Sequence, residues 1–264
     1  MFEETLRVVT LNTWKCSGDY NQRLLLMIAG LRALSPDIVL LQEDFCRLDT
    51  DQSTSTTLAK HLNLNCKAAP ARKKKRLVNG IDVISTSGLA ILSRKLPTRS
   101  MIMDLPTDDA DGERIALFAT VPILHGSLNL CNVHLSHLEN RDDLRQRQLG
   151  DIVHKLSLYE KTDQFLLGGD FNCDATSDPL SWLITQVSAP MREPNCDWTT
   201  TLNQSTCINI GANLDHLFFG SGNSSLRPRA ITYTRVMDTL DAQKGIYPSD
   251  HAGLMLDISF AHGV

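Results

Sequence analysis

The sequence lacks the patterns that would place it in a membrane or hold it together by cross-links. No apolar run approaches the roughly 18 residues of a membrane-spanning helix, and the first residues carry no basic stretch typical of a secretion signal. The seven cysteines are odd in number, scattered and without any Cys-x-x-Cys pair, which argues against a disulfide framework and a structural zinc site. We therefore expect an unsecreted protein of the reducing cytoplasm.

The sequence also lacks an excess of positive charge, and it has no linker that would divide it into domains. The formal net charge of −4 gives no general attraction to polyanions, so nucleic-acid binding would depend on a local patch. The chain of 264 residues is 42% hydrophobic, enough for a full core, and no low-complexity tract interrupts it. We expect a single domain over residues 1–264 and a monomer.

Charged residues cluster in two places. Residues 72–76 read Arg-Lys-Lys-Lys-Arg, the only strong charge run. Most such runs are solvated loops, and a direct role in substrate binding is the alternative. Aspartates at positions 104, 108, 109 and 111 form an acidic stretch that we expect to be a solvated loop as well.

The first part of the chain predicts a βαβ unit. Apolar residues at helical spacing indicate a helix over residues 21–34, between β-branched or apolar strands at 6–11 and 38–41. An almost wholly apolar second strand is typical of a parallel pair. Asn12 and Glu43, which follow the two strands, should then lie at the same edge of one sheet.

The second part of the chain repeats this arrangement. A strand at 128–133 leads to His134, a helix is expected over residues 144–156, and an apolar strand at 165–167 leads to Asp170. Polar residues again follow two strands joined by one helix. Two such halves facing one another would bring four strand ends into a single cleft.

The other elements are expected around these two units. Further strands are predicted at residues 88–93, 114–124, 214–219, 230–234 and 254–258, and further helices at 53–62 and 177–187. A hairpin turn is predicted at 125–126, and the polar residues 188–213 are expected to form a loop.

Two strand ends stand out chemically. The strand at 165–167 ends in Gly168 and Gly169, followed by Asp170 and Asn172; these residues either form a turn and helix cap or present chemistry at the end of a strand. Asp215 lies within an apolar strand, where a carboxylate needs a buried partner, and a histidine is the obvious candidate.

Eight polar residues lie at the boundaries of apolar strands. They are Asn12, Glu43, His134, Asp170, Asn172, Asp215, Asp250 and His251. Each alone has an ordinary structural explanation. Together they form an oxygen-rich set without a thiolate, which suits Mg²⁺, with Mn²⁺ as the alternative, and such a metal supports phosphoryl chemistry.

Several motifs occur along the chain in the order of a known family. They are Thr10-Leu11-Asn12-Thr13-Trp14, Leu40-Leu41-Gln42-Glu43, Gly88-Leu89-Ala90-Ile91-Leu92-Ser93-Arg94, Asn132-Val133-His134-Leu135, Gly169-Asp170-Phe171-Asn172, Leu214-Asp215-His216-Leu217-Phe218 and Ser249-Asp250-His251. The series resembles the endonuclease/exonuclease/phosphatase superfamily of Mg²⁺-dependent phosphoesterases, which share the DNase I-like fold. The resemblance implies a four-layer α/β/β/α sandwich, with two mixed β-sheets packed face to face and helices outside.

The resemblance also implies where a metal would bind. Glu43 is similar to the principal metal ligand of the family, Asn12 lies beside it and helps to hold metal or phosphate, and Asp250 lies close to the metal. A bound Mg²⁺ or Mn²⁺ would then serve hydrolysis by in-line attack of water.

The remaining roles follow from the same resemblance. Asp170 and Asn172 are similar to the pair that positions the attacking water and the scissile phosphate, with Asp170 as the candidate base. His251 resembles the phosphate-binding histidine, oriented by Asp215. His134 occupies the position that contacts the phosphate or the leaving group.

The resemblance leaves the substrate open. The first hypothesis is a phosphodiesterase or nuclease, for which a nucleic acid is the candidate substrate. The alternative is a sphingomyelinase-like or other small-molecule phosphoesterase. A further alternative is an inactive binding module on the same scaffold. His216 replaces a tyrosine found in many members, which we interpret as a packing change. Gly168 and Gly169 are expected to leave room for the phosphate.

Overall fold

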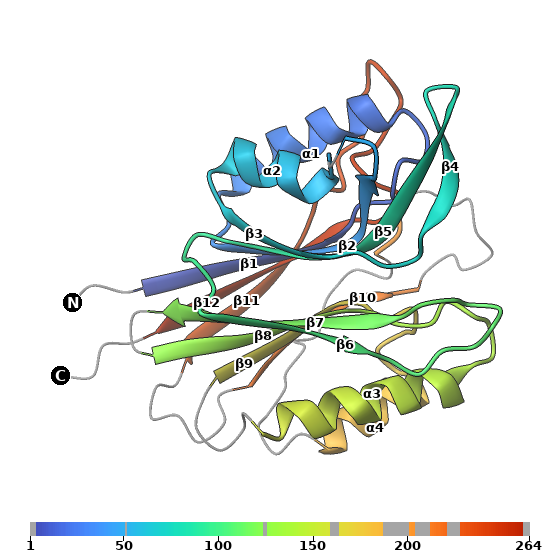
Figure 1. Ribbon diagram of the computed structural model, residues 1–264. Coiled ribbons are helices and arrows are strands. Elements are labelled where there is room, and N and C mark those ends of the chain that lie inside the picture. Colours follow the sequence, from blue (N-terminus) through green and yellow to red (C-terminus); the bar gives the residue numbers. More distant parts are fainter. Residues whose placement is uncertain are drawn as a thin grey trace.

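The computed structural model of the protein describes residues 4–50, 52–123, 126–158, 164–186, 201–203, 212–220 and 228–260. Figure 1 shows two β-sheets stacked face to face, with helices on both outer faces. The predicted four-layer sandwich is therefore confirmed. Among the described residues, none of the helices is long and apolar enough to cross a membrane.

The larger sheet has seven strands in the order β11-β12-β1-β2-β5-β3, with β4 paired to β5. Their bounds are β1 Glu4–Asn12, β2 Ile38–Arg47, β3 Asn65–Ala69, β4 Lys74–Val78, β5 Ile81–Ser93, β11 Pro228–Val236 and β12 Gly253–Phe260. The helices α1 (Tyr20–Leu34) and α2 (Thr54–Leu62) cover its outer face.

The smaller sheet has five strands in the order β10-β9-β8-β7-β6. Their bounds are β6 Arg99–Asp104, β7 Ile115–Ile123, β8 Gly126–His134, β9 Gln164–Asp170 and β10 Asp215–Gly220. The helices α3 (Asp142–Leu156) and α4 (Asp178–Gln186) cover its outer face.

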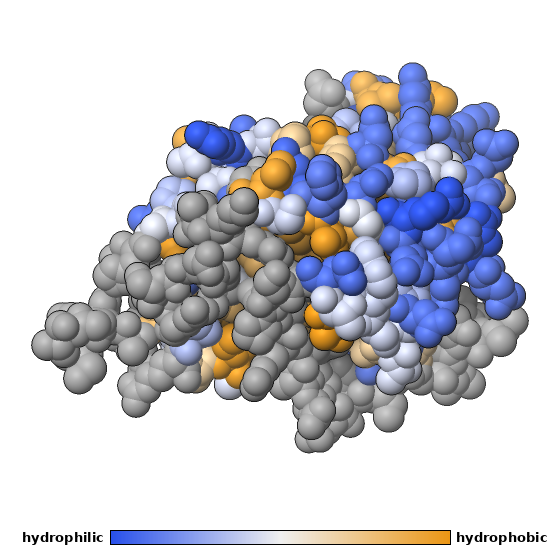
Figure 2. Space-filling model, turned by 90° about the horizontal axis from the view of Figure 1, so that it is seen from below, coloured by the Kyte–Doolittle hydropathy of each residue, from blue (hydrophilic) through white to orange (hydrophobic). Residues whose placement is uncertain are grey.

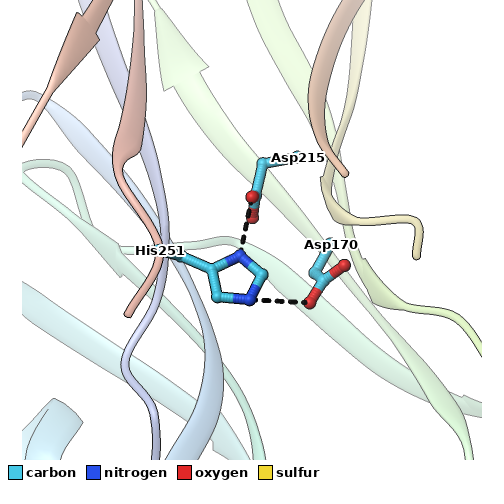
Figure 3. Close-up of side chains that lie close together, drawn as sticks. All are labelled: Asp170, Asp215 and His251. Atoms are coloured by element: carbon cyan, nitrogen blue, oxygen red, sulfur yellow. Dashed lines mark hydrogen bonds and ion pairs between the residues drawn. The ribbon is translucent and has the colours of Figure 1, made fainter. Parts of the chain in front are cut away.

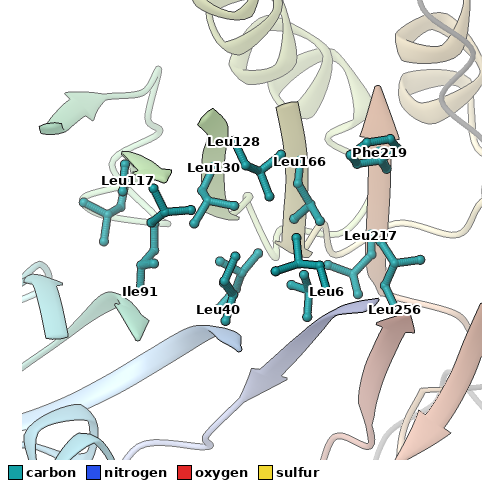
Figure 4. Close-up of a cluster of buried hydrophobic side chains, with 14 of the residues drawn as sticks. Leu6, Leu40, Ile91, Leu117, Leu128, Leu130, Leu166, Leu217, Phe219 and Leu256 are labelled. Atoms are coloured by element: carbon teal, nitrogen blue, oxygen red, sulfur yellow. The ribbon is translucent and has the colours of Figure 1, made fainter. Parts of the chain in front are cut away.

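The core between the sheets is built from the inward-facing side chains of both. Figure 4 shows leucines such as Leu40 and Leu256 of the larger sheet meeting Leu130, Leu166 and Leu217 of the smaller one. Each fully buried leucine contributes about 1.5–3 kcal/mol through removal from water. The position of the two sheets relative to one another, and hence of the strand ends, is fixed mainly by this layer.

Both predicted βαβ units are confirmed. β1 and β2 run parallel, with Asn12 opposite Gln42, and β8 and β9 run parallel, with His134 opposite Asp170. The other strand pairs are antiparallel, so both sheets are mixed. The sequence patterns thus place four polar strand ends at one edge of the sandwich.

Three strands were not predicted, namely β3, β4 and β6. One correction follows for the basic run, because Lys74, Lys75 and Arg76 belong to β4 and not to a loop. A second concerns the acidic stretch, in which Asp104 ends β6 and Asp111 is buried. The hairpin turn at His125 and most of the predicted loop, at 188–200 and 204–211, lie outside the described residues.

The two glycines at the end of β9 serve packing, and the expectation that they leave room for a phosphate was wrong. A Cβ on Gly168 would lie 2.4 Å from Leu217 Cδ2 and 2.9 Å from Leu40 Cδ1, in the core between the sheets. A Cβ on Gly169 would lie 2.0 Å from the carbonyl oxygen of Val133 on the paired strand β8, and the φ of Gly169 is +142°.

Gly169→Ala is expected to lower the free energy of unfolding by about 3 kcal/mol, because it adds backbone strain and a clash with a neighbouring strand. Urea unfolding measures this. Gly150→Ala in α3 is the matched control, since its Cβ would meet only Trp182 Cη2 at 4.0 Å and alanine favours a helix by up to about 1 kcal/mol. Equal stability of the two variants would contradict the packing role of Gly169.

Candidate active site

A cleft of about 540 Å³ opens at the edge where the strands β1, β8 and β9 end. The predicted residues on its wall are Asn12, Glu43, His134, Asp170, Asn172, Asp250 and His251. The eighth predicted residue, Asp215, is buried behind His251 and hydrogen-bonded to it. Residues more than 200 positions apart in the sequence therefore meet in one site, as the two facing units predict.

Asp170 is the most enclosed carboxylate on the cleft wall. Its Oδ2 accepts a hydrogen bond from Asn12 Nδ2 at 2.9 Å, and its Oδ1 accepts one from the backbone N–H of Asn172 at 2.9 Å. Burial raises the pKa of Asp170 to about 6, while the nearby charge of His251 opposes the shift. A fixed carboxylate with a pKa close to neutrality is suited to accept a proton.

His251 lies between two carboxylates (Figure 3). Its Nδ1 is 2.8 Å from Asp215 Oδ2, and its Nε2 is 3.9 Å from Asp170 Oδ2. Burial alone would lower the pKa of His251, but Asp215, Asp170 and Asp250 together raise it to about 10. The imidazole is therefore a cation at neutral pH. The prediction that Asp215 has a buried histidine partner is confirmed, although Asp215 begins β10 and does not lie in its middle.

His134 differs from His251 in its charge. Its Nε2 lies 3.5 Å from Asp170 Oδ2. Burial, with the positive charges of Arg114 and Lys15, holds the pKa of His134 well below its usual range. The cleft thus offers a neutral and a cationic imidazole on either side of one carboxylate.

Glu43 reaches the cleft from a β-bulge. The strand β2 was expected at residues 38–41 with Glu43 following it, but it continues to Arg47, and its pairing with β5 shifts between Gln42 and Asp44. Glu43 has a φ of 55° and a side chain that is 11% exposed. A bulge re-aims a side chain in this way.

Backbone strain gathers around the same cleft. Trp14, Lys15, Glu43 and Asn172 all have positive φ and all line its wall. Non-glycine residues in this conformation cost of order 1–3 kcal/mol each and occur preferentially at functional sites. The surrounding fold therefore holds these four residues in a strained backbone conformation.

The donor set fits a hard divalent cation. Asn12, Glu43 and Asp250 present oxygen atoms to the cleft, and no cysteine lies on the part of its wall that the structure describes. A positive charge already lies at Glu43, because Lys15 Nζ is 2.5 Å from Glu43 Oε1. Burial raises the pKa of Asp250, and the charge of Glu43 adds to this shift, so a cation between them would relieve the repulsion.

A second group of potential ligands is less suited to a metal. Asp170, Asp215 and His251 offer three ligand atoms within 4.8 Å of one another. Both ring nitrogens of His251 face carboxylates, however, and its raised pKa keeps both protonated. The cationic His251 thus already supplies positive charge to Asp215 and Asp170.

Residues that the sequence did not predict complete the site. The same cleft is also lined by Lys15, Arg72, Arg76, Arg114 and His137. The basic run gave a partial signal for Arg72 and Arg76. No pattern in the sequence indicated the ion pair between Asp111 and Arg114.

His216 contributes packing and not a second imidazole in the cleft. It is buried, its ring stacks on Phe218 at 5.8 Å between centroids, and Phe171 meets it edge-on at 5.4 Å. Its Nε2 lies 3.0 Å from the carbonyl oxygen of Cys173. This position agrees with the packing interpretation made from the sequence.

The sequence was compared with models of known protein families, and one family matches. The profile of the endonuclease/exonuclease/phosphatase family matches residues 9–251. A search of curated proteins found no significant match.

Solved structures share the fold at low sequence identity. An endonuclease/exonuclease/phosphatase family protein from Bacteroides thetaiotaomicron has 18% identity and a TM-score of 0.70, covering 99% of this chain and 100% of its own. The human Nocturnin catalytic domain with a bound sulfate anion has 19% identity and a TM-score of 0.70, with coverage of 97% and 95%. TDP2 from C. elegans has 17% identity and a TM-score of 0.67, with coverage of 97% and 75%.

Proposed function

The chain belongs to the endonuclease/exonuclease/phosphatase family of phosphoester hydrolases, and from this premise we propose that it is a Mg²⁺-dependent phosphodiesterase of the nuclease type. Residues 1–264 would form one catalytic domain. The observation that carries the proposal is the buried Asp170 with its raised pKa, placed between cationic His251 and neutral His134 on the wall that also presents Glu43.

In this proposal the chain's own residues move the proton and hold the phosphate. Asp170 accepts a proton from the attacking water, and the backbone N–H of Asn172 donates to Asp170 Oδ1 and so holds the carboxylate in place. His251, kept cationic by Asp215, donates a hydrogen bond from Nε2 to a phosphate oxygen. Neutral His134 contacts the phosphate or the leaving oxygen.

The proposed metal ligands are Glu43, Asn12 and Asp250. Bound there, Mg²⁺ or Mn²⁺ would polarise a phosphate oxygen and offset charge on the leaving oxygen. Asn12 also ties the two halves of the site together, because its Nδ2 donates to Asp170 while its Oδ1 accepts the backbone N–H of Trp14 at 2.9 Å.

A panel of phosphoesters tests the proposed function. It comprises bis-p-nitrophenyl phosphate, single- and double-stranded DNA, RNA, 5′-tyrosyl DNA, sphingomyelin and inositol phosphates, each with Mg²⁺ or Mn²⁺. We expect hydrolysis of phosphodiesters and inhibition by a chelator. Cleavage of sphingomyelin or inositol phosphates alone would support the alternative of a small-molecule phosphoesterase. A chain that hydrolyses none of them and binds no divalent ion would be an inactive binding module.

Glu43→Gln is expected to weaken the activation by Mg²⁺ at least about tenfold, because the amide loses the charge that attracts the cation. Measuring activity against Mg²⁺ concentration gives this shift. Glu139→Gln is the matched control, since this residue lies outside the cleft around Glu43. Equal metal dependence of the two variants would remove Glu43 from the proposed ligand set.

The raised pKa of Asp170 sets an expected acid limit for activity. A base must be ionised, so kcat/KM should be level above a pH of about 6 and fall about tenfold per pH unit below it, as the carboxylate takes up a proton. The pH profile at saturating Mg²⁺ measures this limit. A profile that stays flat through this region would argue against Asp170 as the group that accepts the proton.

A further inference from the structure

We propose that Arg72, Arg76 and Arg114 form a second anion-binding subsite beside the reacting phosphate, which selects substrates that carry another phosphate group. This inference rests on the proposed function, since it concerns the substrate of the same cleft. The three arginines come from the loop before β4, from β4 and from the residue before β7. In Figure 2 strongly hydrophilic side chains gather at the end of the molecule that carries the β4–β5 hairpin in Figure 1.

Arg114 is fixed in place and borders the proposed catalytic residues. Its Nε and Nη2 donate to Asp111 at 3.0 and 2.6 Å, and its side chain is only 3% exposed. Its Nη1 donates to the backbone carbonyl oxygen of His134 at 3.3 Å. Arg114, His134 and Asp170 line the same cleft, so an anion near Arg114 would lie beside the reacting group.

Arg72 has a guanidinium without a strong partner. Its Nη1 is 3.9 Å from Asp111 Oδ1, and among the described residues its side chain makes no hydrogen bond within 3.5 Å, although only 17% of it is exposed. Glu113 Oε2 accepts the backbone N–H of Arg72 at 2.6 Å and so fixes the backbone. Burial and the charge of Arg114 lower the pKa of Arg72.

Arg76 is held by neutral acceptors. Its Nη1 donates to the Ser85 carbonyl oxygen and Oγ at 3.0 and 2.9 Å, and its Nη2 donates to Ser87 Oγ at 2.8 Å and to the Arg72 carbonyl oxygen at 3.2 Å. These contacts orient the side chain without neutralising it. Burial lowers the pKa of Arg76.

The charge balance of the cluster favours an anion. Among the described residues, Asp111 is the one carboxylate within 4.0 Å of these three guanidinium groups. Arg72 makes no side-chain hydrogen bond among the described residues, so its planar guanidinium would bind the phosphate oxygens, which it matches better than a flexible lysine does. The hydrogen bonds of Arg76 and Arg114 occupy most of their N–H groups, so these two side chains would mainly add fixed positive charge. Arg72, Arg76 and Arg114 line the same cleft as Glu43 and His134, so the second phosphate would lie next to the proposed metal ligands.

Three substrates with the same leaving group test the subsite. The reference is the p-nitrophenyl ester of thymidine 5′-phosphate. The second substrate carries an added 3′-phosphate, and the third extends the reference by two nucleotides through phosphodiesters. We expect at least one of the two to exceed the reference at least tenfold in kcat/KM at low salt, with the gain falling as salt rises. The preferred one shows whether the second phosphate comes from a small bisphosphate or from a nucleic-acid strand.

Arg72→Gln is expected to reduce the ratio of kcat/KM between the preferred substrate and the reference at least tenfold. Lys73→Gln is the matched control, because Lys73 is exposed on the same segment and does not line the cleft. A ratio close to one in the wild type, or a ratio unchanged by Arg72→Gln, would overturn the subsite.

Direct binding keeps the subsite testable if the proposed function fails. Calorimetry would compare thymidine 3′,5′-bisphosphate, a trinucleotide with 5′-phosphate and thymidine 5′-phosphate. If no phosphoester is hydrolysed, the subsite still requires tighter binding of one of the first two, with the preference lost in Arg72→Gln. Equal binding of all three would refute the subsite even for an active hydrolase.

Discussion

Asp170→Asn is expected to lower kcat about 10³-fold on every phosphodiester that the wild type hydrolyses. The amide nitrogen and oxygen fill the same space, but neither takes up a proton at neutral pH. In the wild type, Asn12 Nδ2 donates to one oxygen of Asp170 and the Asn172 N–H donates to the other. Asparagine at this position keeps one acceptor oxygen and therefore one of these two hydrogen bonds. We therefore expect KM to change much less than kcat.

The matched control is Asp151→Asn on α3, because it makes the same chemical change at an exposed position outside the cleft. Single-turnover kinetics separate the chemical step from product release. A kcat of Asp170→Asn within tenfold of the wild type would mean that another group accepts the proton. A parallel loss of Mg²⁺ affinity would instead indicate that Asp170 acts through the metal.

The fold could be predicted from the sequence where strands are buried on both faces. Continuous apolar runs at 38–41 and 165–167 are too short for a helix and are typical of central strands. The helix between each pair of strands fixes their direction. The strands that were missed, β3, β4 and β6, pair along one side and carry exposed or charged side chains. A strand of this kind has too little apolar patterning to differ from a loop.

That the residues of the candidate site would lie together was predictable for a related reason. Eight carboxylates, amides and histidines next to buried strands share few structural explanations, so their coincidence at six strand boundaries pointed to chemistry. The bulge at Glu43 was not predictable, because the register shift depends on the pairing between β2 and β5. The burial of Asp111 also depends on partners, Arg114 and His137, that a single charge pattern does not identify.

Arg23 is a buried charged residue that contacts two segments of the cleft. It lies on the apolar face of α1 with Met27, Ile28 and Leu31, and it is 1% exposed. Its guanidinium donates to the backbone carbonyl oxygens of Thr13, Trp14, Lys15, Ser17 and Pro248 at 2.8–3.2 Å. The first four follow Asn12, and the last precedes Asp250 and His251, so one side chain joins two segments of the cleft.

Arg23→Met is expected to lower the free energy of unfolding by about 3 kcal/mol, because buried carbonyl groups lose their donor. It should also lower kcat where the variant is still folded, since both site segments lose their common anchor. Arg23→Lys keeps the charge but reaches fewer carbonyls, and we expect an intermediate effect. Urea unfolding and kinetics well below the melting temperature measure the two effects separately.

Arg32→Met on the same helix is the control for the Arg23 variants. Arg32 is exposed and donates to the carbonyl oxygen of His61 at 3.2 Å, so its replacement should cost no more than about 0.5 kcal/mol. If Arg23→Met lost stability but kept the kcat of the wild type, the two segments would hold their positions without the guanidinium. The strained backbone at Trp14 and Lys15 would then be fixed by contacts other than those of Arg23.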